Sequence, residues 1–377
     1  MEDRLQKLIE GYKDPKRTQW ALEWKNRGGK VIGFASAYVP EEVLHAAGIL
    51  PWRIVGAWHR NTPNAGVYRP DYSCGYCTNV LESVLAGELD FLDGLIIPDE
   101  DQDMLRLWDV LVALRAKPFC HSMHIPYVVN DRSYQFLTGE IRRLISKIED
   151  FSEAKITDDA LRSSIHTYNK MRDLLGSMYE LRKREIPPLT GAEALGIALS
   201  AQVMPKELFN EELSALLPFI ENRRANLKSL HPRILLSSEM LDEPAYVSLI
   251  EEGGLVAMDD MDTGSRYFGQ NVDTSLEDPA HALARRYISR HGSPRMSHWE
   301  EQIAEIKQRV NDFKIDGVIT LPLVWCYPQR FRAPLLNDRL REAGIPTAIF
   351  EREYQLANAG QLRTRIGAFL ETLEVKR

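Results

Sequence analysis

The chain has 377 residues, two to three times the length of a typical single domain, which predicts more than one core. Hydrophobic residues make up 44% and charged residues 27%, a composition typical of globular rather than disordered proteins. The net charge of −7 argues against a nucleic-acid partner, which would need a clustered basic surface. No apolar run reaches the roughly 20 residues that span a bilayer, and the N-terminus has no apolar signal-peptide core. We therefore expect a cytoplasmic protein with no membrane partner.

Two segments of the chain repeat one strand pattern. Residues 90–98 read DFLDGLIIP and residues 312–322 read DFKIDGVITLP. Each is a short apolar run after an Asp-Gly turn and ends at a proline, which is typical of a buried parallel strand. The sequence therefore predicts two similar halves.

The similarity extends to both sides of these segments. Residues 30–56 and 232–260 both predict a strand, a polar loop with serine, a helix, a glycine and a second strand. Residues 125–131 and 345–351, IPYVVND and IPTAIFE, each predict a further strand led by a proline. Each half is thus expected to form a parallel sheet covered by helices.

A helical region separates the two halves. Apolar residues between 134 and 230 recur at i, i+3 and i+4, with charged residues on the outer faces. We predict an α/β protein with two pseudo-repeated parallel-sheet domains and an additional helical layer, against which the N-terminal segment packs. The expected boundaries are an N-terminal helical segment at 1–27, a first α/β domain at 28–133, the helical region at 134–230 and a second α/β domain at 231–377.

The four cysteines are the candidate site residues. Ligands of open α/β sheets bind beyond the carboxyl ends of the strands. Cys326 lies just past the second-half DG strand, and Cys74 and Cys77 form a C-x-x-C pair before a predicted helix. Cys120 follows KPF, near a predicted strand of the first half. This placement allows all four thiols to face one cleft between the halves.

Such a set of thiols fits several kinds of site. Three or four thiolates can hold an iron–sulfur cluster. Zinc is an alternative, with Cys74, Cys77, Cys120 and His124 as its ligands. A redox-active C-x-x-C pair is another, since a helix N-terminus lowers the pKa of a thiol. Some of the cysteines also suit small buried positions in a core.

Four segments carry a resemblance to a known family. They are YVPEEVLHAAGILPWRIVG, the Cys74 region with the following LAGELDFLDGLIIP, the LPLVWC stretch that ends at Cys326, and the tail IPTAIFEREYQLANAGQLRTRIGAFLETLE. The tail is the most specific of them and contains Glu351, Tyr354, Gly360, Gln361, Arg363 and Arg365. With these segments the chain resembles, over nearly its whole length, the 2-hydroxyacyl-CoA dehydratase and benzoyl-CoA reductase family of iron–sulfur subunits.

The resemblance implies a fold of two flavodoxin-like halves with a helical layer. It implies a [4Fe–4S] cluster held by three cysteines between the halves, with Cys74 and Cys326 as the first candidates and Cys77 and Cys120 competing for the third place. It also implies a homologous second subunit and a separate ATP-dependent iron–sulfur activator.

The implied activity is low-potential one-electron chemistry on an acyl-CoA thioester, which gives a ketyl radical. The product step is either loss of water, as in a dehydratase, or reduction of an aromatic acyl-CoA, as in a benzoyl-CoA reductase. A non-catalytic partner subunit that lacks a full set of cluster ligands is a third alternative.

The sequence departs from the family pattern after the first-half DG strand. A cysteine is expected there, but the segment after Pro98 reads DEDQDMLRLW, so Asp101 stands at about that position. Either Cys77 or Cys120 replaces the missing ligand, Asp101 supplies an oxygen, or the cluster is altered or absent. Acidic residues here also suit a helix N-terminus.

Several other residues are candidates for supporting roles. His121 and His124 flank Cys120 and are candidate donors to a cluster sulfur, and Trp325 is a candidate shield against water. Candidate contacts to CoA phosphates are Arg53, Arg330 and Arg332. The chain has neither a G-x-G-x-x-G nor a P-loop motif, which fits a subunit that relies on an external ATPase.

Overall fold

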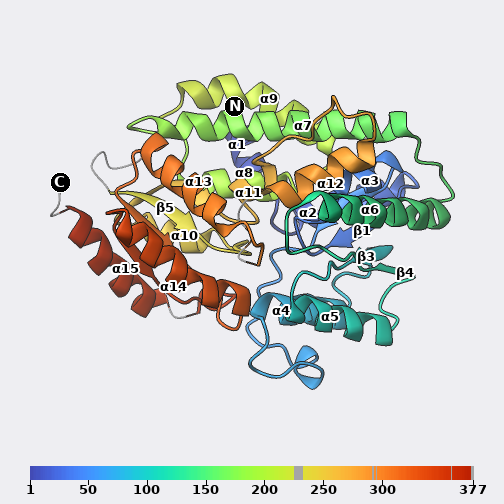
Figure 1. The fold of residues 1–377 in the computed structure, drawn as a ribbon, viewed down its shortest axis with the longest axis horizontal. Coiled ribbons are helices and arrows are strands. Elements are labelled where there is room, and N and C mark those ends of the chain that lie inside the picture. The colour runs from blue at the N-terminus through green and yellow to red at the C-terminus, as the bar shows by residue number, and fades with distance from the viewer. Residues whose placement is uncertain (225–231, 291–292, 294, 358, 375–377) are drawn as a thin grey trace.

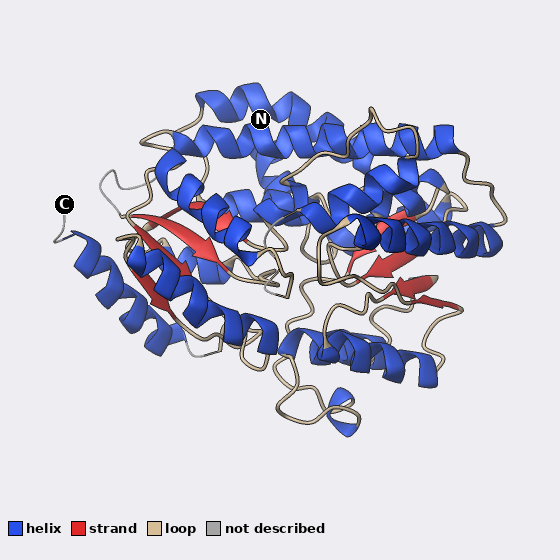
Figure 2. Ribbon diagram, in the orientation of Figure 1, coloured by secondary structure: helices blue, strands red, loops and turns tan. Residues whose placement is uncertain are grey.

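The structure, a computed structural model, describes residues 1–224, 232–290, 293, 295–357 and 359–374. Two separate sheets lie side by side, and helices surround both of them (Figures 1 and 2). The first and last helices of the chain lie on the side of the second sheet (Figure 1).

Both sheets have four parallel strands in the same order. The first sheet has the order β2-β1-β3-β4, and the second has β6-β5-β7-β8. The strands are β1 Val31–Phe34, β2 Leu50–Arg53, β3 Gly94–Ile96, β4 Phe119–His121, β5 Arg233–Ser237, β6 Leu255–Asp260, β7 Gly317–Thr320 and β8 Thr347–Ile349. The identical order confirms the predicted α/β fold with two pseudo-repeated, flavodoxin-like halves.

The prediction of a strand at 125–131 was wrong. The fourth strand of the first sheet is β4, in which Phe119 pairs with Gly94 and His121 with Ile96. Residues 127 and 128 are half-exposed, and Pro126 has no N–H to donate to a sheet. The matching segment of the second half does form a strand, β8, whose Thr347 pairs with Val318.

Helices cover the faces of each sheet. In the first half these are α3 Glu41–Ala46, α4 Gly75–Leu85 and α5 Gln102–Ala113, with a 3-10 turn at Ala65–Val67. In the second half they are α10 Ala245–Ile250, α11 Ser265–Phe268, α12 Pro279–Ser289, α13 Trp299–Asp312, α14 Tyr327–Glu342 and α15 Ala359–Glu374. The largest buried side chains, such as Trp52, Phe34 and Tyr246, fill the space beneath these helices.

The helical layer forms where the apolar spacing predicts it. Its helices are α6 Asp131–Ser152, α7 Asp158–Glu180, α8 Gly191–Ser200 and α9 Lys206–Asn222, with a 3-10 turn at Leu181–Lys183. The predicted continuation of α9 to 230 falls partly on residues 225–230, which lie outside the described residues.

The N-terminal helices α1 Glu2–Ile9 and α2 Lys16–Asn26 extend the layer. Leu5 and Leu8 of α1 share a buried cluster with Phe209 and Leu213 of α9, as the amphipathic pattern predicts. In the part of the chain that the structure describes, no helix is long and apolar enough to cross a membrane.

Polar contacts join the two halves. Asp242 of the second half accepts the N–H of Gly56 at 2.5 Å and the hydroxyl of Tyr354 at 2.7 Å. The buried Arg53, at the end of β2, donates to Asp262 past the end of β6 at 2.6 Å. The carboxyl ends of strands from both sheets therefore meet at one junction, where a ligand of this fold is expected.

Candidate functional site

Three of the four cysteines meet where the halves join. Cys74 is the N-cap of α4, Cys77 lies in the first turn of the same helix, and Cys326 is the N-cap of α14. All three are buried, and the Cys74 sulfur is hydrogen-bonded to the thiols of both Cys326 and Cys77. Each half therefore contributes thiols to the same cluster of sulfurs.

This arrangement makes Cys74 the most acidic of the three thiols. Hydrogen bonds from Cys326 and Cys77, and from the backbone N–H groups of Cys77 and Tyr76, hold the pKa of Cys74 well below its usual value. The hydrogen bond with Cys74, together with burial, raises the pKa of Cys77 and of Cys326 well above the usual range. Cys74 is therefore the thiol of the three that loses its proton most readily, and thiolates are the form that binds metals.

Acidic residues at the start of α5 surround the thiols. The Asp103 carboxylate accepts the N–H of Cys74 at 3.1 Å and pairs with the buried Arg69. Asp101 caps α5 by accepting the N–H of Met104 at 2.8 Å. Burial, Glu100 and the Cys74 thiolate raise the pKa of Asp101 to about 7. This link places the Asp101 carboxyl within electrostatic reach of Cys74.

Cys120 and its histidine neighbours have other surroundings. The Cys120 sulfur lies on β4, 3.7 Å from the backbone oxygen of Lys117. His121 points to the opposite face of the strand and is stacked on Phe119, with a centroid separation of 6.3 Å. His124 is paired with Asp99 at 3.0 Å. The structure thus brings together Cys74, Cys77 and Cys326, and it places Cys120 and His124 in separate contacts.

The other candidate residues predicted from the sequence differ in their exposure and in their partners. Trp325 directly precedes Cys326, is partly exposed and has a φ of 65°, a left-handed value that is unusual for a bulky residue. Arg330 lies over its ring at 5.4 Å and pairs with Glu351 at 2.8 Å. Arg332 lies 5.0 Å from the Trp299 ring. Arg53 is completely buried on Asp262, which does not suit a contact to a CoA phosphate.

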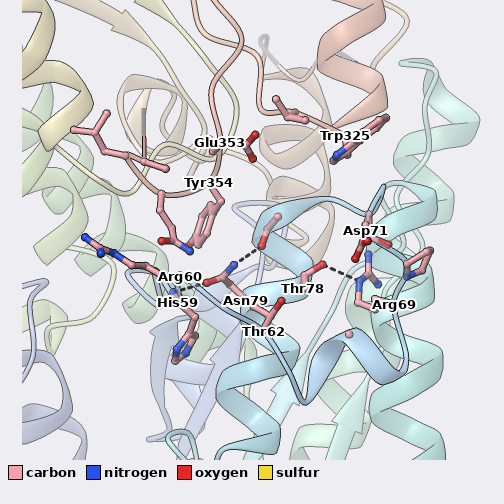
Figure 3. Close-up of a pocket in the computed structure, with 18 residues that line it drawn as sticks. His59, Arg60, Thr62, Arg69, Asp71, Thr78, Asn79, Trp325, Glu353 and Tyr354 are labelled. Atoms are coloured by element: carbon pink, nitrogen blue, oxygen red, sulfur yellow. Dashed lines mark hydrogen bonds between the residues drawn. The ribbon is translucent and has the colours of Figure 1, made fainter. Parts of the chain in front are cut away.

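A hollow of about 660 Å³ opens where the two halves meet (Figure 3), and its wall includes Ser73, Gly75 and Trp325, the sequence neighbours of Cys74 and Cys326. Its wall combines the 59–79 segment of the first half with residues 324–325 and 353–357 of the second. Asn79 and Thr78 of α4 face it, and Tyr354 lies opposite them (Figure 3). The hollow is therefore another feature that both halves build.

A second group of charges at the junction was not predicted from the sequence. Glu100 accepts from Ser36 at 2.7 Å, and Glu239 is paired with the buried Arg266. Burial raises the pKa of Glu239 to about 8 despite this partner. The guanidinium of Arg295 is buried and lies 3.9 Å from a carboxylate oxygen of Glu100. The sequence signal for this group is weak: a serine follows the first strand of each half, Ser36 in one and Ser238 in the other.

The side chains at the junction can be compared with the ligands that an iron–sulfur cluster needs. No group of three or more His, Cys, Asp or Glu side chains within the described ranges is arranged to hold a metal ion. Three thiols at the starts of α4 and α14, with the Asp101 carboxyl at the start of α5, nevertheless match the ligand types of an iron–sulfur cluster, which accepts widely separated cysteines. The residues present therefore fit such a group.

Comparison with known proteins defines the family. The fold and the thiols at the junction are those of a duplicated α/β protein with a candidate site between its halves. Residues 36–373 match the model of the family described as 2-hydroxyglutaryl-CoA dehydratase, D-component. The chain belongs to this family, whose named relatives include enzyme subunits of acyl-CoA metabolism.

Three relatives illustrate the range of the family. The (R)-phenyllactyl-CoA dehydratase beta subunit of Clostridium sporogenes is 27% identical over 92% of each chain. A benzoyl-CoA reductase subunit of Thauera aromatica is 25% identical over 94% of each chain. The (R)-2-hydroxyglutaryl-CoA dehydratase beta subunit of Acidaminococcus fermentans is 26% identical over 93% of this chain and 94% of its own. Each of these proteins is named as one subunit of a larger enzyme.

Proposed function

We propose that the chain is the iron–sulfur subunit of a 2-hydroxyacyl-CoA dehydratase-type enzyme. The observation that carries the proposal is the meeting of Cys74, Cys77 and Cys326, from both halves, at the N-termini of two helices. Helix N-termini favour the negative charge that a thiolate-bound cluster holds. Relatives matched over more than nine-tenths of both chains are dehydratase beta subunits, which supports the same function.

The three cysteines hold a [4Fe–4S] cluster in this proposal, and the Asp101 carboxyl is a candidate for a fourth contact. When bound, the cluster supplies one-electron transfer at low potential to an acyl-CoA thioester. Arg69 and Asp103 fix the loop before α4, because Asp103 accepts the backbone N–H of Cys74. Met104 contacts the Cys77 sulfur at 3.5 Å and fills the apolar side of the site.

The proposal includes a homologous second subunit and a separate ATP-dependent activator. Dehydratase relatives are designated beta, which implies that other subunits accompany them. An aromatic acyl-CoA is the second candidate substrate, because the benzoyl-CoA reductase relative is nearly as similar to this chain as the dehydratase relatives are.

Anaerobic reconstitution tests the proposal. The chain is co-purified with its homologous subunit and activator, and iron and acid-labile sulfide are measured per chain. The complex is then assayed with a 2-hydroxyacyl-CoA and with benzoyl-CoA. We expect about four irons per chain and loss of water from the first substrate. Reduction of benzoyl-CoA without dehydration supports the reductase alternative, stoichiometric zinc supports a zinc site, and metal-free protein in a stable complex supports a non-catalytic partner subunit.

A further inference from the structure

Cys74 and Cys77 form a pair of thiols at the start of one helix. Cys74 is the N-cap of α4, and Cys77 follows three residues later in its first turn. Residues three positions apart in a helical turn are neighbours, and the Cys74 sulfur is hydrogen-bonded to the Cys77 thiol. Both cysteines are free thiols. A disulfide between them closes within one helical turn, so it requires no movement of one half relative to the other.

The two thiols differ in their access to solvent. Cys74 is 7% exposed, whereas Cys77 is 1% exposed. The sequence neighbours of Cys74, Ser73 and Gly75, line the hollow between the halves (Figure 3). The Cys77 sulfur lies 3.5 Å from the sulfur of the buried Met104. A small reagent that enters the hollow therefore meets Cys74 first, with Cys77 behind it.

Cys326 is the competing partner for Cys74. Its sulfur also contacts that of Cys74, but it belongs to the second half. An S–S bond is about 2.0 Å long, much shorter than a hydrogen bond between sulfurs, so this bond would draw the halves together. They are already closely packed here, because a Cβ on Gly75 would lie 2.9 Å from the Cβ of Tyr354. The geometry therefore favours Cys77.

We propose that Cys74 and Cys77 form a reversible disulfide when a peroxide reaches the chain before a cluster is inserted. Hydrogen peroxide oxidises the Cys74 thiol to a sulfenic acid and is itself reduced to water. The Cys77 thiol then attacks the Cys74 sulfur, the S–S bond forms, and the hydroxyl group leaves with a proton as a second water. Two thiols and one peroxide thus give one disulfide and two waters. A dithiol reductant returns both thiols by exchange.

The disulfide controls when the site can be filled, a role that rests on the proposed function. An iron–sulfur cluster needs three or four ligands, and the disulfide leaves only Cys326 of the three thiols. The oxidised chain therefore takes up no cluster until a dithiol reductant has acted. Without a neighbouring thiol, a sulfenic acid is oxidised further to sulfinic acid, which thiols do not reduce. The pair thus preserves the ligand set of the chain during oxidation.

Peptide mapping tests the proposal. The full chain is stripped of iron with a chelator, reduced, freed of reductant and treated with hydrogen peroxide. The remaining thiols are alkylated in denaturant, and the chain is digested with trypsin. Because trypsin does not cut before Pro70, Cys74 and Cys77 share the peptide 61–106, whereas Cys326 lies on 315–330.

The expected product is a link within one peptide. We expect peptide 61–106 to lose the mass of two hydrogen atoms at its cysteines, which fragment spectra locate. Two of the four thiols of the chain are expected to escape alkylation, and dithiothreitol is expected to restore all four.

Two variants separate the possible partners of Cys74. In Cys77→Ser, Cys74 is expected to gain two oxygen atoms, and dithiothreitol is expected not to return its thiol. The matched control is Cys326→Ser, which removes the other sulfur in contact with Cys74 and is expected to form the disulfide as the unmodified chain does. Circular dichroism verifies that each variant is folded.

Three results overturn the proposal. They are a cross-link between peptides 61–106 and 315–330 in the unmodified chain, failure of dithiothreitol to restore its thiols or of peroxide to remove them, and full recovery of the Cys74 thiol in Cys77→Ser. The mapping uses no iron. Its failure is therefore distinct from that of the proposed function, which iron and sulfide analysis tests.

Discussion

Asp101 and Cys326 occupy equivalent positions in the two halves: each is the N-cap of the helix that follows the third strand of its sheet. The bridges that precede them, Asp99 to His124 and Leu323 to Arg352, are equivalent too. The position where the family pattern expects a cysteine thus holds a carboxyl in the first half. Cys77 lies one helical turn after Cys74 and is the third thiol that the structure brings together with Cys74 and Cys326.

This relationship predicts a rescue. Cys77→Ser is expected to lower the iron content of the anaerobically purified chain, because it removes one of three thiolate ligands. Adding Asp101→Cys to Cys77→Ser returns a thiolate to the symmetric position, and the iron content is expected to recover. Iron analysis of the single and double variants checks the prediction. Equal iron in Cys77→Ser and the unmodified chain would show that Cys77 is no ligand.

Asp101 has a structural role that can be separated from its charge. Asp101→Ala removes the hydrogen bond to the N–H of Met104 and is expected to cost about 1 kcal/mol of unfolding free energy. Asp101→Asn retains a good cap and should cost much less. Urea titrations of both variants measure the difference. Equal destabilisation by the two would attribute the effect to the charge rather than to the cap.

Gly75 allows the two halves to approach closely at the thiols. A Cβ at this position would lie 2.9 Å from the Cβ of Tyr354, which is anchored by Asp242. Gly75→Ala is therefore expected to lower the free energy of unfolding by about 1 to 3 kcal/mol through overpacking. The control is Gly66→Ala in the preceding loop, where a Cβ meets nothing within 4 Å. Thermal unfolding of both variants tests this, and equal melting temperatures would contradict it.

His121 is expected to make the fold sensitive to acid. Burial lowers the pKa of His121 to about 4, below the ordinary value of 6.5, so the folded state binds fewer protons than the unfolded state between these pH values. Its contribution to stability is complete above pH 6.5 and falls as the pH drops towards 4, by on the order of 3 kcal/mol. His121→Leu should flatten this part of the stability profile.

The matched control for His121 is His166→Leu, which changes an exposed residue of α7. Urea unfolding of the two variants and of the unmodified chain at intervals across the acid range gives the comparison. A profile that stays as steep in His121→Leu as in the unmodified chain would assign the acid sensitivity to other groups.

The sequence could predict the elements that local pattern determines. The DG strands at Gly94 and Gly317 and the helices of the middle layer carry their own apolar periodicity, and the structure confirms them. The segment at 125–131 has an equally apolar pattern but no sheet position, because the short strand at Phe119 already pairs with β3. Short strands depend on distant partners, and a single segment carries no information about them.

The candidate site, too, could be predicted only in part from the sequence. Strand ends and helix starts pointed to all four cysteines, and the family resemblance placed Cys74 and Cys326 first. The choice between Cys77 and Cys120 depends on which way each side chain faces. Cys77 lies one turn along α4 from Cys74, but Cys120 lies on an edge strand beside Lys117. The buried charges of Glu239 and Arg266 come from elements 27 residues apart in the chain, so no local motif predicted them.

The iron content of two cysteine variants tests most directly that a cluster lies between the halves. Cys326→Ser and Cys120→Ser are purified anaerobically beside the unmodified chain, and iron and acid-labile sulfide are measured per chain. If Cys326, from the second half, completes a site begun by Cys74 and Cys77, then Cys326→Ser loses most of its iron and Cys120→Ser keeps the full amount. Full iron in Cys326→Ser together with loss in Cys120→Ser would contradict the account.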